Sequence, residues 1–103
     1  MITPLTVSTD RDDDGKTVLV ASGEIDLSNI ETFTHALAAA VGDGRFVVDL
    51  SAVDYLDSVG INALFTYADH IRLIAGPTLM SVLTVSGITE LVSVERVDNP
   101  TTR

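Results

Sequence analysis

The 103-residue chain contains no cysteine. Disulfides, thiolate metal sites, thiol nucleophiles and redox-sensing thiols are therefore excluded. No apolar run approaches the roughly 20 residues that span a bilayer, and the first fifteen residues lack both a basic segment and a continuous apolar stretch. From these absences we expect a soluble, cytoplasmic protein whose chemistry uses oxygen and imidazole groups.

Basic residues are also scarce, since 6 Lys and Arg stand against 15 Asp and Glu, for a formal net charge of −9. Phosphate backbones and anionic membrane surfaces repel such a chain. We therefore expect no direct binding to nucleic acid and no association with membranes. The length and the 46% of hydrophobic residues predict a single globular domain over residues 1–103.

Patterns for metal binding and catalysis are incomplete. The run 10–15 matches the start of an EF-hand calcium loop, but its twelfth position is Ala21 rather than glutamate, so we interpret the run as a hairpin turn. His35 and His70 have no second ligand at metal-binding spacing and are expected at the surface. A nucleophile elbow needs a glycine two residues before its serine, but that residue is Leu56 before Ser58, and no phosphate-cradling glycine loop occurs. We expect no metal site, no cofactor and no enzymatic activity.

Hydrophobic periodicity predicts alternating strands and helices. The expected strands lie at 5–9, 17–22, 45–50, 71–75 and within 91–97. The first two form a hairpin, whereas the third is apolar on both faces, as in a strand with a parallel neighbour. Residues 51–57 are expected to be a connector.

The first two helices are predicted from capping signals and apolar stripes. Ser28 with Glu31 three residues later forms a capping box, which predicts a helix start. Its apolar stripe comprises Ile30, Phe33, Leu37 and Val41. A second helix is predicted from Ser58 to near His70.

The C-terminal third allows two assignments. We prefer a strand at 71–75 followed by a helix at 77–86, because Pro77 suits a helix start. The alternative continues the preceding helix through Leu73 and places a strand at 78–83. Short apolar runs do not decide between strand and helix, so both assignments remain open here.

The segment VVDLSAVDYLDSVGINAL, residues 47–64, passes from a strand-like run to a helix-like run at Asp57 and Ser58. Asp or Ser at such a junction commonly caps the free amides of the helix. A helix N-terminus also favours an attached anion, so a phosphate on Ser58 is compatible with the fold. Capping and phosphorylation are both open interpretations of the junction.

This segment, together with GEIDLSNIETF at 23–33 and VLTVSGITELVSV at 82–94, resembles the STAS domain, and specifically the bacterial anti-sigma factor antagonists. The resemblance covers most of the chain. It implies an α/β fold, namely a single STAS-type domain with a mixed β-sheet of four to five strands and helices packed against it. Between Ala68 and Pro77 the chain is shorter than the family pattern, which implies a fourth strand that is either short or displaced.

The resemblance also implies a function in transcription regulation by partner switching. An anti-sigma factor that is also a serine-protein kinase would bind the unphosphorylated protein and release it after phosphorylating Ser58, and a phosphatase would reverse the modification. Val59 stands where the family often has a second serine, which leaves Ser58 as the only hydroxyl within Asp57–Gly60. The expected partner-binding residues are Glu24, Asp26, Ser28, Asp57, Val59 and Gly60.

In the resemblance, Glu24 and Asp26 belong to an acidic loop beside the serine, and Gly60 would let the partner's backbone approach. Two other functions stay open. The first is a STAS interaction module of a stressosome, a lipid-transport system or a transporter-regulatory system. The second is an enzyme or nucleotide-binding protein in its own right.

Overall fold

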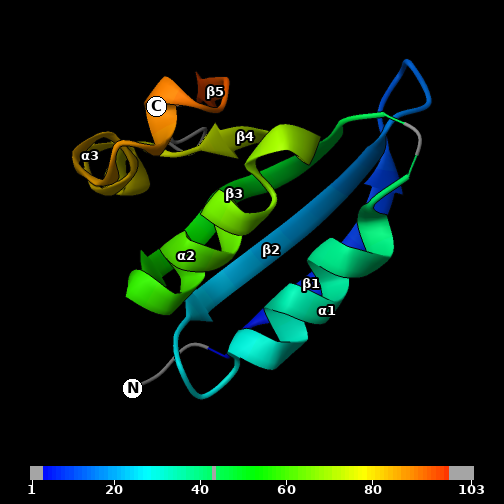
Figure 1. The fold of residues 1–103 in the computed structure, drawn as a ribbon. Helices are drawn as coiled ribbons and strands as arrows, with labels where there is room; N and C mark the ends of the chain where they lie inside the picture. Colours follow the sequence, from blue (N-terminus) through cyan, green and yellow to red (C-terminus); the bar gives the residue numbers. More distant parts are fainter. Residues whose placement is uncertain (1–3, 43, 98–103) are drawn as a thin grey trace, which may run out of the picture.

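The computed structural model describes residues 4–42 and 44–97, which form one five-stranded sheet with helices packed on it (Figure 1). The strands are β1 (Thr6–Arg11), β2 (Thr17–Ile25), β3 (Phe46–Leu56), β4 (Ile71–Ala75) and β5 (Val94–Arg96). The helices are α1 (Ile30–Ala40), α2 (Ser58–Thr66) and α3 (Pro77–Ser86), with short 3₁₀ turns η1 (Ala68–His70) and η2 (Ile88–Glu90).

The strands are ordered β1-β2-β3-β4-β5 across the sheet. The first pair is antiparallel and the other three are parallel, which confirms the predicted mixed α/β sheet. The predicted hairpin between β1 and β2 is confirmed, but its turn is shorter than the run 10–15, because Asp10 and Arg11 belong to β1 and pair with β2. There the Asp12 carboxylate accepts hydrogen bonds from the amides of Asp14 and Lys16, and Gly15 takes a φ of 79°.

Helices cover one face of the sheet, where α1 and α2 lie side by side over β2 and β3 (Figure 1), and α3 packs on β3 and β4. Apolar side chains of the strands and helices meet there in one core. Its largest fully buried members are Phe33, Phe46, Leu19, Ile25, Leu37, Leu50, Leu64, Ile71, Leu73, Leu79, Leu83 and Ile88.

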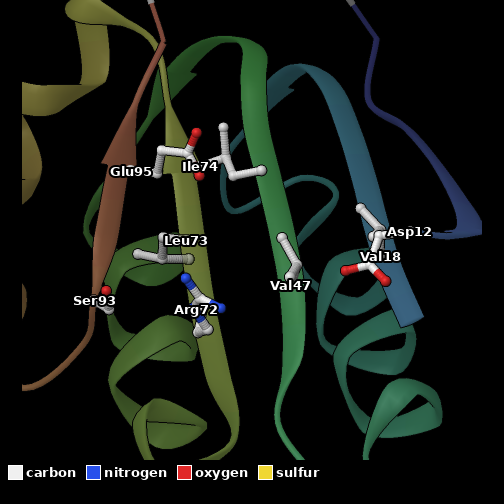
Figure 2. A pocket seen from close by; sticks show the side chains of 8 residues that line it. All are labelled: Asp12, Val18, Val47, Arg72, Leu73, Ile74, Ser93 and Glu95. Atoms are coloured by element: carbon white, nitrogen blue, oxygen red, sulfur yellow. The ribbon is translucent and has the colours of Figure 1, made fainter. Parts of the chain in front are cut away.

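The other face of the sheet carries a shallow hollow (Figure 2). Val18, Val47 and Ile74 form its apolar part, and Arg72 and Glu95 project from β4 and β5 beside them. These side chains point away from α1 and α2, which lie behind the strands in this view.

The predicted connector at 51–57 is wrong, because β3 continues to Leu56 and pairs with the end of β2. The register shifts twice along this pair, between Val20 and Ser22 and between Gly23 and Glu24. Irregular pairing of this kind breaks the period-two alternation that identifies a strand in sequence. The burial pattern of residues 51–56 accordingly has two exposed residues between buried ones.

The predicted capping box is also wrong. The helix α1 begins at Ile30, with Asn29 as an N-cap that makes no side-chain capping bond. Phe33 and Leu37 of the predicted stripe are buried, whereas Val41 lies exposed beyond the last helical residue. The helix α2 begins at Ser58 as predicted but ends at Thr66, and η1 then carries the chain to His70.

The C-terminal third follows the preferred assignment, with β4 at 71–75 and α3 at 77–86, so the alternative is wrong. Pro77 occupies the first turn of α3, and Gly87 ends the helix with a φ of 88°, a left-handed conformation that favours glycine. All five residues of β4 pair with β3, which confirms the short fourth strand. The edge strand β5 lies within 91–97, as predicted.

Candidate functional site

The junction between β3 and α2 is organised by Asp57. Its carboxylate oxygen Oδ1 accepts hydrogen bonds from the amides of Val59 at 3.1 Å and Gly60 at 3.4 Å. Its own amide donates to the carbonyl of Ile25 at 3.2 Å. Asp57 is therefore the N-cap of α2, and it also fastens the start of the helix to the end of β2.

Ser58 is the first residue of α2 and is exposed. Among the described residues, 4–42 and 44–97, its hydroxyl has no hydrogen-bond partner. The capping role predicted for either residue at this junction thus belongs to Asp57 alone. The hydroxyl of Ser58 is presented to solvent at the positive end of a helix.

Gly60 lies inside this junction, since it is buried and faces the sheet. A Cβ atom here would lie 2.3 Å from Leu56 Cδ1 and 3.1 Å from Ile25 Cγ2. The expectation that Gly60 admits a partner's backbone is therefore corrected. The glycine instead lets α2 pack closely on β2 and β3 of its own chain, and Val59 beside it is half-buried.

The loop between β2 and α1 is closed by its own side chains. The Asp26 carboxylate accepts from the amide of Ser28 at 2.9 Å and from its hydroxyl at 2.5 Å. Asn29 donates from Nδ2 to the carbonyl of Glu24 at 2.8 Å and accepts from the Asp26 amide at 3.0 Å. Asn29 was not predicted as part of the site, although an asparagine directly before a helix is a known signal for local backbone bonding.

The two junctions are neighbours, because Ile25 pairs with Leu56 and accepts from the Asp57 amide. The structure therefore brings the loop of Asp26 and Ser28 beside the start of α2. The side chain of Glu24 behaves differently. It alternates with buried neighbours along β2, so it projects from the sheet face opposite the helices.

Two large apolar side chains stand exposed at this end of the sheet and were not predicted as site residues. Leu27, at the tip of the loop after β2, is 73% exposed, and Tyr55, near the end of β3, is 50% exposed. In the sequence, Leu27 could have been noticed as an apolar residue between Asp26 and Ser28 in a polar loop.

The charge around the junction has one sign. Residues 17–44 and 46–71 contain no lysine or arginine, whereas Glu24, Asp26, Asp54 and Asp57 all lie near the ends of β2 and β3. An added phosphate would thus enter a region that is already acidic.

The described residues offer neither a metal-binding cluster nor a helix suited to crossing a membrane. Within 4–42 and 44–97, no group of three or more His, Asp or Glu side chains is placed to hold a metal ion. His35 and His70 are exposed, as predicted. In the same part of the chain, no helix combines the length and the apolar character needed to cross a bilayer.

Comparisons with known proteins agree with this architecture. The family model described as the STAS domain matches residues 6–94. The crystal structure of an anti-sigma factor antagonist from Mycobacterium paratuberculosis superposes with a TM-score of 0.80 at 29% identity, covering 96% of this chain and 88% of that one.

Curated sequences give partial matches. The anti-sigma-F factor antagonist RsfB of Mycobacterium tuberculosis is 39% identical over 62 residues, which are 58% of this chain and 51% of RsfB. BtrV of Bordetella bronchiseptica is 31% identical over 72 residues, 68% of this chain and 62% of BtrV. The chain thus spans between half and two thirds of the length of these relatives.

Proposed function

The chain belongs to the STAS domain family, and from that premise we propose that it is an anti-sigma factor antagonist that is switched by phosphorylation of Ser58. The unphosphorylated protein binds an anti-sigma factor with serine-protein kinase activity. Phosphorylation ends that binding, and a phosphatase restores it. The names of RsfB and of the structural neighbour support the antagonist function.

The proposal rests on one observation. Asp57 caps α2, whereas the Ser58 hydroxyl makes no hydrogen bond among the described residues. Asp57 accepts from two free amides of α2, those of Val59 and Gly60, without help from the Ser58 hydroxyl. A kinase can therefore modify Ser58 without removing a stabilising bond. The exposed position supports the same conclusion, because a kinase must reach the hydroxyl.

A phosphate on Ser58 would release the anti-sigma factor because its charge is repelled by nearby carboxylates and is costly to desolvate in an interface. It adds about −1.5 to −2 charges beside Asp57, at the start of α2. A partner that packs on this end of the sheet would have to desolvate both anions. A hundredfold loss of affinity corresponds to about 2.7 kcal/mol, which a buried, uncompensated phosphate can supply without a change of fold.

The proposed contact surface contains Asp26, Ser28, Asp57 and Val59, together with the exposed Leu27. Gly60 supports this surface from below, because it is buried. Glu24 would contact only a partner that reaches round to the opposite sheet face.

The test is a kinase assay with mass-spectrometric mapping. The protein is incubated with ATP and each anti-sigma factor kinase of its source organism, and the Ser58→Ala variant is treated in parallel. We expect one phosphate on Ser58 and none on the variant. A label on Ser28 or another residue would contradict the proposal, and so would recovery of transport or scaffold proteins, with no anti-sigma factor, in a pull-down.

A further inference from the structure

A second feature begins one helical turn beyond Ser58. Helices α2 and α3 border an open groove of ≈ 390 Å³, lined by Ile61 of α2 and by four residues of α3. The four are Ser81, Val82, Val85 and Ser86. Val85 is 87% exposed and Val82 is 36% exposed, so this apolar surface faces solvent.

The residues that line the groove are uncharged, and Arg96 lines an adjoining pocket that shares Ser81 and Val85 with it. Residues 58–68 and 73–89 contain no charged side chain, although 20% of all residues are charged and the net charge is −9. A surface helix of a soluble domain normally carries charged residues on its outer side. In α3 the outer side instead carries valine, serine and threonine.

The groove is continuous with the proposed switch residue. Ile61 follows Ser58 by three positions, and residues at this spacing are neighbours on a helix surface. A partner helix seated against Ile61 therefore reaches the exposed Ser58. Asp57 lies one turn before Ile61, whose amide donates to its carbonyl, so an acidic side chain marks this end of the uncharged surface.

We propose that the groove between α2 and α3 receives an uncharged, apolar helix face of the anti-sigma factor. This inference rests on the proposed function and identifies the part of the partner that binds. A charged surface would lose its hydration against walls that offer no counter-charge, whereas an apolar helix gains from burial there. A second copy of this chain is disfavoured as the occupant, because each copy carries nine net negative charges.

The test places a charge of either sign at Val85. Because Val85 is 87% exposed, Val85→Lys and Val85→Asp should fold like the parent, which urea unfolding checks. We expect both variants to bind the anti-sigma factor kinase at least about tenfold more weakly by calorimetry, equivalent to about 1.4 kcal/mol. The matched control is Val41→Lys, an exposed valine at the end of α1, which should bind like the parent.

The outcomes separate the two proposals. If both Val85 variants bind unchanged while Ser58 is still phosphorylated, the groove proposal is wrong and the proposed function stands. A gain of affinity with Val85→Lys would show an ionic partner surface and overturn the groove proposal. If sedimentation equilibrium shows a dimer that Val85→Lys disperses, the occupant is a second copy instead. If the parent protein binds no anti-sigma factor, both proposals are wrong.

Discussion

Two stretches of the molecule have similar sequences but differ in the hydrogen bonding of their serines. One is the loop between β2 and α1, and the other is the junction between β3 and α2. Each follows a parallel strand, and each contains an aspartate and a serine. In the first, Asp26 binds Ser28 and the helix starts without a side-chain cap. In the second, Asp57 caps the helix and leaves the Ser58 hydroxyl unbonded within the described residues.

The comparison shows that a serine near a helix start is not by itself a candidate for modification. What distinguishes the two is the hydrogen-bond partner chosen by the neighbouring aspartate. In both places the carboxylate accepts from the amide two residues later. In the first loop that residue is Ser28, whose hydroxyl also donates to Asp26. At the second junction it is Val59, so the carboxylate of Asp57 passes over Ser58.

The largest expected effect is a loss of affinity for the anti-sigma factor when Ser58 carries a negative charge. Ser58→Asp places a carboxylate beside Asp57, and we expect affinity for the anti-sigma factor to fall by about a hundredfold, or about 2.7 kcal/mol. Isothermal calorimetry with the purified kinase measures this change. The control Ser8→Asp adds the same charge on the exposed strand β1 and should leave affinity unchanged. Undiminished binding by Ser58→Asp would contradict the switch.

An intermediate effect is expected on the unfolding free energy when Asp57 is replaced. Asp57→Ala removes the acceptor for the Val59 and Gly60 amides, and we expect a loss of about 1 kcal/mol in unfolding free energy. Asp57→Asn keeps an acceptor oxygen and should retain most of that stability. Urea unfolding of the parent and both variants provides the measurement. Equal stability of Asp57→Ala and the parent would show that the cap is not stabilising.

The smallest expected effect is on stability when each serine is shortened. Ser58→Ala removes no hydrogen bond, so its unfolding free energy should stay within about 0.5 kcal/mol of the parent. Ser28→Ala loses the bond to Asp26 and should be less stable by about 0.5 to 1 kcal/mol. Urea midpoints of the two variants measured side by side give the difference. A greater loss in Ser58→Ala than in Ser28→Ala would reverse the comparison.

The sequence by itself determined the order of strands and helices as far as α2, the start of α2 at Ser58 and the family motifs. These features depend on short-range properties, namely apolar periodicity, helix-starting proline and helix-ending glycine, which a local stretch of sequence carries in full. The hairpin was predictable for the same reason, whereas α3 was only the preferred of two assignments, because its short apolar run suits a strand as well.

Other features were decided only by the tertiary structure. The extension of β3 to Leu56 depends on irregular pairing with β2, and the inward position of Gly60 depends on how α2 lies on those strands. The groove brings Ile61 and Val85 together from two helices separated by β4. Such contacts form between segments distant in sequence, so no local pattern specifies them. Even the choice of Asp57 over Ser58 as the cap is a matter of geometry, because both residue types accept helix amides and only the fold shows which one does.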